Sequence, residues 1–392
     1  MGEATFDPET GEIIRQYVDL STLTLDGQRL PFTFVKSDFL WKNEDPAFRA
    51  MIKELEKAPQ PGFFLTNKEG NGTIRTRWAL NRHGIWKSEK FRDSNGLLYR
   101  DVDAKGIGYT RGHPPVFLSV REPEMSGDME MRGISDYDVA IGDRLHSEEI
   151  YGMGIRIARF VAQIELLELV NQEGEIVPRQ EIGDKLGLNF DRVRPTLSLR
   201  AMGTTARVWD INFIDEKVKN RGYVREIIDD AIALVSEELG QELTPADYAA
   251  WFVDTMGKQL GLMHKNRVWT DFMAQIHGGM HNLTLDGRLC DTYHYQTPQS
   301  CKRRFEHLKA EVEKHKESQP HLSQLNEQML EEQFGKTEEQ VRKQNAKGEA
   351  TDKWHHVRVA ENFLIGVNEI HPTGILAKEA KQRLEKAYAS ER

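Results

Sequence analysis

The spacing of apolar residues changes along the chain, from strand-like in its first half to helical in its second half. Residues 73–80 alternate between polar and apolar, Asn95-Gly96 is a hairpin turn signal, and residues 97–104 continue the strand pattern. A helix is expected at 142–151, followed by a β-branched, apolar stretch at 155–170. Strands, one helix and strands again predict an antiparallel sheet with a helix on one face.

Beyond residue 170 the helical spacing prevails. The amphipathic stretch 223–239 predicts one helix, and Thr244-Pro245 is a start signal for a long helix that reaches about residue 268. A further charged helix is expected at 303–316, and the tail, 319–392, is polar with a helical pattern. We expect this tail to be a solvated helical extension.

Composition narrows the class of protein. The chain has 392 residues, of which 39% are hydrophobic and 29% charged, as is usual for globular proteins. It lacks the apolar run of about 18 residues that a membrane span needs, and its acidic, polar start does not have the pattern of a secretory signal. With cysteine only at Cys290 and Cys301, a reducing cytoplasm is the expected compartment. The net charge of −9 argues against a broad nucleic-acid-binding surface.

A short predicted hairpin carries the first candidate chemistry. Asn282 and Asp291 stand at its two ends, and Asp286-Gly287 is its turn signal. Mg²⁺ takes few oxygen ligands from a protein and keeps the rest of its shell for water and phosphate, so one amide and one carboxylate suit it. Protein kinases hold their metal ions with an Asn and a later Asp in this way. The alternative is an ordinary hairpin with polar residues at its ends.

Two upstream segments add to this candidate site. Lys105 ends a predicted strand, and Gly106 and Gly108 after it would let a phosphate approach the backbone. Glu148 lies in the helix predicted at 142–151, where it could pair with Lys105 across the sheet. Taken singly, Lys105 is equally a surface lysine before a turn, and Glu148 equally part of a solvated helical face.

Together these segments resemble the selenoprotein O family, which are protein-kinase-like enzymes that transfer AMP from ATP to proteins. Four motifs of that family occur here in the same order. They are the Lys-Gly-x-Gly-x-Thr segment at 105–110, Ser147-Glu148, Arg207-Val208, and the His-Gly-x-Met loop at 277–280 followed by Asn282 and Asp291. The resemblance covers roughly residues 95–295.

The resemblance implies an α+β, protein-kinase-like fold with two lobes and a nucleotide between them. Residues 73–170 would form an N-lobe with an antiparallel sheet, and residues 171–302 a mainly helical C-lobe with the metal site. Residues 1–72 would be a lead-in, and residues 303–392 a helical C-terminal extension. The implied activity is transfer of AMP from ATP, with Mg²⁺ or Mn²⁺, to an acceptor that is a protein, a peptide or a small molecule.

The resemblance also implies a role for each candidate residue. Those expected to contact the phosphates are Lys105, Gly106, Gly108 and Arg207, while Asn282 and Asp291 would hold the metal ion and Glu148 would hold Lys105. His281 stands where the family has an aspartate, its presumed base. An imidazole titrates near neutral pH and could take over this proton role, or His281 could be structural.

Departures from the family keep other functions open. Besides the change to His281, a second family arginine has no counterpart in this chain. The chain could therefore be a kinase that phosphorylates a small molecule or peptide, or an inactive, kinase-like binding module. A zinc hydrolase is disfavoured, because Gly278-Gly279 interrupt the helical spacing between His277 and His281.

Overall fold

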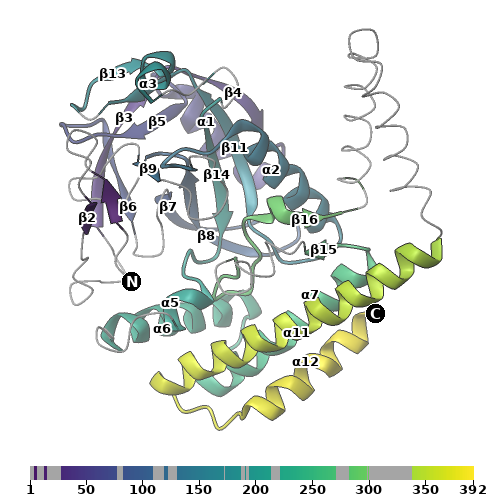
Figure 1. Cartoon of the computed structure of the whole chain (residues 1–392). Coiled ribbons are helices and arrows are strands. Elements are labelled where there is room, and N and C mark those ends of the chain that lie inside the picture. The colour runs from purple at the N-terminus through teal and green to yellow at the C-terminus, as the bar shows by residue number, and fades with distance from the viewer. Residues whose placement is uncertain are drawn as a thin grey trace.

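The structure is a computed structural model that describes most of the chain. The described residues are 4–6, 13–15, 28–76, 83–108, 119–121, 130–171, 173–186, 190, 194–212, 221–270, 282–297, 299 and 338–392. They form an α+β architecture, an eight-stranded antiparallel sheet followed by helices (Figure 1), which confirms the predicted class. None of the helices within these residues has the length and apolar character needed to cross a membrane.

The eight strands follow one another in the order β4-β11-β14-β8-β7-β6-β3-β5. Their bounds are β3 (Gln28–Val35), β4 (Ser37–Lys42), β5 (Gly62–Leu65), β6 (Gly72–Thr76), β7 (His83–Arg92), β8 (Leu98–Lys105), β11 (Arg159–Leu166) and β14 (Thr196–Met202). The sheet curls so that its two ends meet, because the backbone N–H of Gly62 in β5 donates to Ser37 Oγ in β4 at 2.8 Å. The hairpin predicted at Asn95-Gly96 joins β7 to β8, and Gly96 has a φ of 81°.

The sheet extends across the expected segment boundaries at residues 72 and 170. Strands β3, β4 and β5 come from the expected lead-in, and β14 comes from the segment expected to be mainly helical. Strand β3 pairs with β5 and β6, β4 with β11, and β14 with β8 and β11. The sheet is therefore one unit that gathers strands from residues 28 to 202.

Alternation along the strands gives the sheet one apolar and one polar face. On β8, Val102 and Ala104 enter the apolar core, to which α1 (Arg49–Lys57), after the 3₁₀ helix η2 (Pro46–Phe48), also contributes. Asp103 and Lys105, which lie between and beyond them, point to the opposite face although they are buried. Helix α2 (Tyr137–Gly152) lies along the sheet, as Figure 1 shows. The polar face of β8 is thus enclosed within the protein.

The helices of the second half lie together beneath the sheet (Figure 1). They are α5 (Val208–Asn212), α6 (Arg221–Leu239), α7 (Pro245–Lys265), α11 (Glu338–Ile370) and α12 (Ala377–Glu391). The predicted start of α7 is confirmed, since Thr244 and Asp247 exchange side-chain to backbone hydrogen bonds in a capping box. Helix α6 occupies the predicted position as well.

Short elements complete the described structure. Two-stranded pairings join β1 (Ala4–Phe6) to β2 (Ile13–Arg15), β9 (Ser119–Arg121) to β10 (Glu130–Arg132), β12 (Glu168–Val170) to β13 (Ile176–Pro178), and β15 (Trp269–Thr270) to β16 (Tyr295–Gln296). Helix α3 (Arg179–Leu186) follows β13, and the 3₁₀ helix η4 (Thr292–His294) precedes β16.

The C-terminal helices are part of the core, so the expectation of a solvated tail is wrong for them. Phe363 of α11 and Leu384 of α12 are buried in the same apolar core as Phe252 of α7. The rings of Phe252 and Phe363 stack with their centroids 3.8 Å apart. Charged residues are interspersed among the apolar ones along these helices, which hides their buried faces in the sequence pattern. The helix predicted at 303–316 lies outside the described residues.

We expect Gly257→Ala to destabilise the contact between α7 and α12. A Cβ at Gly257 would lie 2.4 Å from Leu384 O and 2.9 Å from Ala387 Cβ, so α12 would have to move. The free energy of unfolding should fall by roughly 1–3 kcal/mol, measured as a lower urea midpoint. Gly152→Ala is the matched control, because a Cβ there meets nothing within 4 Å. If both variants unfold at the wild-type midpoint, α12 does not pack this closely.

Candidate functional site

The hairpin predicted around Asp286-Gly287 is present. The backbone N–H of Cys290 donates to Asn282 O at 2.9 Å, and that of Gly287 donates to Thr284 O at 2.9 Å. Gly287 has a φ of 74°, a conformation that glycine adopts at little cost. Asn282 and Cys290 therefore face each other across the hairpin, and Asp291 follows at once. The predicted placement of Asn282 and Asp291 at the two hairpin ends is confirmed.

Three cationic side chains converge on the carboxylate of Asp291. Lys105 forms an ion pair with it, Arg200 Nη1 donates to Asp291 Oδ1 at 2.6 Å, and Arg207 Nη1 lies 3.5 Å from Asp291 Oδ2. Lys105 ends β8, Arg200 belongs to β14, and Arg207 precedes α5. Of the residues singled out in the sequence, the structure thus brings Lys105, Arg207 and Asp291 together.

Strand pairing brings two further residues, Arg200 and Asp103, into the site. The sequence analysis did not identify them. They are register partners on β14 and β8, and Arg200 Nη2 donates to Asp103 Oδ2 at 2.6 Å. The signal that could have revealed Asp103 is the repeat of charged residues at Asp101, Asp103 and Lys105, with apolar residues between them. Such a repeat places all three side chains on one face of a strand.

Asp143 of α2, also missed, approaches the same groups from the helix. Asp143 Oδ2 lies 3.6 Å from Lys105 Nζ and 3.4 Å from Arg200 Nη1. Asp143 Oδ1 accepts hydrogen bonds from the backbone N–H and the hydroxyl of Thr292, at 2.6 Å and 3.0 Å. We call this set of residues the Asp291 cluster; its members are Lys105, Arg200, Arg207, Asp103, Asp143 and Asp291.

Glu148 does not pair with Lys105, and that expectation is wrong. Its carboxylate accepts hydrogen bonds from Nε and Nη2 of Arg159, both at 3.2 Å. Five residues along an α-helix correspond to a rotation of about 140°, so a helix that directs Asp143 to Lys105 directs Glu148 elsewhere. The spacing of acidic residues on α2 therefore places Asp143, and not Glu148, beside Lys105.

The Asp291 cluster is a buried set of charges that neutralise one another. Burial disfavours the charge on Asp291, but Lys105, Arg200 and Arg207 outweigh it and hold the pKa of Asp291 well below its usual range. Burial also opposes the charge of Arg200, while Asp291 and Asp103 keep its pKa well above the ordinary value. The side chain of Asp291 is 22% exposed and that of Arg200 only 1%, so Asp291 faces outward.

His83 borders the cluster on β7, opposite Lys105 in the strand register. Its Nδ1 lies 3.0 Å from Asp103 Oδ2. Burial lowers the pKa of His83 to about 4, although the neighbouring Asp103 raises it. The imidazole is therefore neutral at neutral pH, and the sequence offered no motif that would have singled it out.

Gly106 and Gly108 serve close contacts within the protein. They have φ values of 96° and 110°, and a Cβ at Gly106 would lie 2.4 Å from Thr196 O. The backbone N–H of Gly108 donates to Gly133 O at 2.7 Å. The segment 109–118 that follows lies outside the described residues, so contact of these glycines with a phosphate stays a prediction.

The oxygen atoms of Asn282 and Asp291 suit a metal ion only when it arrives together with phosphate groups. Among the described residues, no group of three or more His, Cys, Asp or Glu side chains is arranged to hold a metal ion. The Asn282 amide and the Asp291 carboxylate are suitable oxygen donors for Mg²⁺. However, Lys105 and Arg200 already hold Asp291 Oδ1 and would repel a bare cation. The set fits a metal ion that arrives with phosphate groups. His281 lies outside the described residues, and its role stays a prediction.

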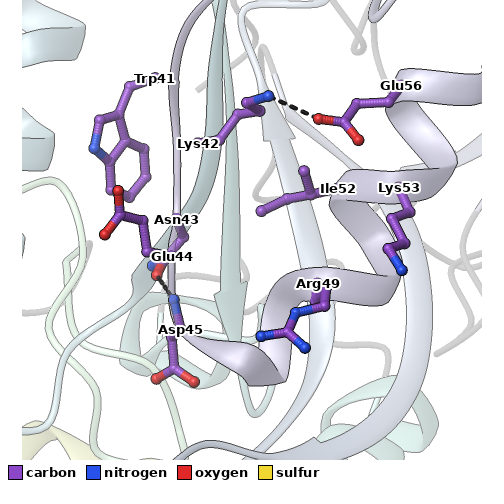
Figure 2. Close-up of a pocket in the computed structure, with 9 residues that line it drawn as sticks. All are labelled: Trp41, Lys42, Asn43, Glu44, Asp45, Arg49, Ile52, Lys53 and Glu56. Carbon is purple, nitrogen blue, oxygen red and sulfur yellow. Dashed lines mark hydrogen bonds and ion pairs between the residues drawn. The ribbon is translucent and has the colours of Figure 1, made fainter.

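A separate groove of about 600 Å³ lies between β4 and α1 (Figure 2). It is lined by Trp41, Lys42, Asn43, Glu44, Asp45, Arg49, Ile52, Lys53 and Glu56. Lys42 and Glu56 pair across it at 2.7 Å, and most of the other charged side chains are exposed. No member of the Asp291 cluster lines this groove. Buried charges that converge on one point offer stronger chemistry than exposed charges of mixed sign, so the cluster is the better candidate site.

His83 gives the stability of the site a pH dependence of known sign. Its pKa falls from an ordinary value of 6.5 to about 4 on folding. Between these values the unfolded chain binds a proton that the folded protein does not, so stability decreases as the pH falls through this range. The contribution is roughly 1.4 kcal/mol per pH unit. Urea unfolding of His83→Gln should show a shallower slope than wild type in this window; equal slopes would mean that the ring is not buried in neutral form.

No family model matches the chain, and no curated protein matches it.

Proposed function

We propose that this protein binds ATP with Mg²⁺ or Mn²⁺ and transfers AMP to a protein, peptide or small-molecule acceptor. The observation that carries the proposal is the convergence of Lys105, Arg200 and Arg207 on Asp291. Asp103 and Asp143 balance part of this positive charge from the enclosed side, so the three cations would be left short of negative charge if Asp291 turned to a metal ion. They suit a ligand that brings several negative charges and a metal ion of its own.

The order of the elements supports a protein-kinase-like arrangement with two lobes. A lysine ends β8, helix α2 then lies along the sheet, two more strands of the sheet (β11 and β14) follow, and a hairpin after α7 carries Asn282 and Asp291. Protein kinases place their phosphate-binding lysine and their metal-binding Asn and Asp in this order. The sheet would be the N-lobe, the helices the C-lobe, and the nucleotide would lie between them.

Each group in the cluster has a part in the proposed reaction. Lys105 and Arg207 would bind phosphate oxygens, and Asn282 with Asp291 would hold the metal ion. A bound Mg²⁺ neutralises phosphate charge. The guanidinium of Arg200 is held by Asp103 and would supply positive charge on the buried side of the site. Positioning and electrostatic stabilisation account for most of the catalysis in phosphate transfer, so a strong base is not required.

Transfer of AMP, instead of the terminal phosphate, is proposed on the resemblance to selenoprotein O. An acceptor hydroxyl would bond to the α-phosphorus as the bond from that phosphorus to the bridging oxygen breaks. Pyrophosphate would leave, and the hydroxyl proton would pass to a base, for which His281 is the candidate. A kinase reaction at the same site would release ADP instead.

We expect the nucleotide and the metal ion to bind only together. Isothermal titration should show binding of Mg²⁺ with a non-hydrolysable ATP analogue and no binding of Mg²⁺ alone, because Lys105 and Arg200 repel a bare cation. Arg207→Met should weaken nucleotide binding by about tenfold or more, the value of a charge-assisted hydrogen bond. Arg358→Met is the control, since Arg358 is exposed on α11, where it pairs with Glu361 and lies over the ring of Trp354, far in sequence from the Asp291 cluster. Equal affinity in both variants would remove Arg207 from the site.

Product analysis separates AMP transfer from its rivals. After incubation with ATP and Mg²⁺, mass spectrometry should find AMP on the acceptor and free pyrophosphate, and Asp291→Ala should abolish both. Phosphate on the acceptor together with ADP would show a kinase instead. Absence of both nucleotide binding and turnover in the wild-type protein would leave only a non-catalytic, kinase-like module.

A further inference from the structure

We infer that Asp143 positions Lys105 for its contact with the nucleotide and ties it to the segment that carries Asp291. The inference rests on the proposed function, because it assigns the residue that holds the phosphate-binding lysine. It differs from the role that the sequence suggested for Glu148. The observation behind it is that the two oxygens of one buried carboxylate face two different parts of the site.

One oxygen of Asp143 faces the cations. Asp143 Oδ2 lies 3.6 Å from Lys105 Nζ and 3.4 Å from Arg200 Nη1, and the side chain of Asp143 is only 2% exposed. In such a setting the attraction between charges is only weakly screened by water. Lys105 therefore pairs with both Asp143 and Asp291.

The other oxygen of Asp143 holds the backbone directly after Asp291. Asp143 Oδ1 accepts from the Thr292 backbone N–H at 2.6 Å and from its hydroxyl at 3.0 Å. Ser147, one helical turn further along α2, places its hydroxyl 2.9 Å from Thr292 Oγ1. His146 Nδ1 lies 2.9 Å from Thr292 O. One face of α2 is thus docked on Thr292, and Asp291 before it has a left-handed backbone with φ 57° and ψ 58°.

In this geometry, Asp143 and Asp291 would respond differently to a bound nucleotide. Asp291 is the more exposed carboxylate and would turn to the metal ion when a nucleotide binds. Asp143 is fully enclosed and stays bound to Thr292, so it can keep Lys105 in place while phosphate replaces Asp291. Without Asp143, Lys105 would lose this buried carboxylate at that step.

Glu148 cannot hold Lys105 while α2 keeps its contacts with Thr292. It holds Arg159, whose guanidinium also stacks on the Tyr151 ring, 3.7 Å from its centroid. Directing Glu148 to Lys105 would require α2 to turn by about 140°. That rotation would break the hydrogen bonds between Asp143 and Thr292.

Selective labelling of Lys105 tests this assignment without any nucleotide. The full-length protein is treated with an amine-acylating reagent, and modification of Lys105 is followed by mass spectrometry. In Asp143→Asn the ammonium loses a charged partner, and we expect its acylation to become about tenfold faster. Glu148→Gln is the matched control and should label at the wild-type rate. Thr292→Val, which loosens the docking but keeps the Asp143 charge, should label within about threefold of wild type.

Turnover with ATP and Mg²⁺ provides the second readout. Asp143→Asn should lower kcat by about tenfold or more, whereas Glu148→Gln and Thr292→Val should remain within about threefold of wild type. A Glu148→Gln variant that changes Lys105 labelling or kcat as strongly as expected for Asp143→Asn would overturn the inference, even if Asp143→Asn itself does not fold. Equal effects of Thr292→Val and Asp143→Asn would reduce Asp143 to a docking residue. If wild-type protein has no turnover, the proposed function fails, and labelling still decides which carboxylate holds Lys105.

Discussion

The pairing of Asp291 with Lys105, Arg200 and Arg207 is the interaction on which the arrangement of the site depends. These groups come from a strand end, a second strand, the start of a helix and the end of a hairpin, so their meeting joins the sheet to the second half of the chain. Removing one partner from such a buried set leaves an uncompensated charge and typically costs about 3–5 kcal/mol. The network thus fixes the relative position of the sheet and the hairpin.

The same pairing would disfavour a lone metal ion, and under the proposed function it would favour a metal ion that arrives with phosphate. Its positive charges are held in place by enclosed carboxylates, Asp103 and Asp143, which do not need to move when a ligand enters. Asp291 is the most exposed member, with 22% of its side chain exposed, and in the proposed reaction it would exchange its cationic partners for a metal ion. A ligand that supplies negative charge would therefore replace one set of ion pairs by another, without leaving any buried charge unpaired.

Local patterns in the sequence predicted most of the local structure. The hairpin at Asn95-Gly96, the capping box at Thr244 and the hairpin between Asn282 and Asp291 depend on a few neighbouring residues, and all of them are present. The closure of the sheet by β4 and β5 and the burial of α12 depend on contacts between distant segments. Periodicity within one segment carries no information about such contacts, so it did not show that the sheet crosses residues 72 and 170 or that α11 and α12 contribute to the core.

The candidate site shows the same limit. Lys105, Arg207 and Asp291 were found through their motifs, and the structure brings them together. Arg200 joined through its strand register with Asp103, which no local motif encodes. The motif pointed to Glu148 on α2, whereas the phase of that helix directs Asp143 to the lysine.

The central claim is that the Asp291 cluster receives the phosphates of ATP together with a metal ion. A crystal structure of the protein with Mg²⁺ and a non-hydrolysable ATP analogue tests it most directly. We predict that Asp291 has left Lys105 for the metal ion, that Asn282 contacts the same ion, and that phosphate oxygens lie on Lys105 and Arg207. A nucleotide bound elsewhere, for example in the groove between β4 and α1, with Asp291 still paired to Lys105, would contradict the claim.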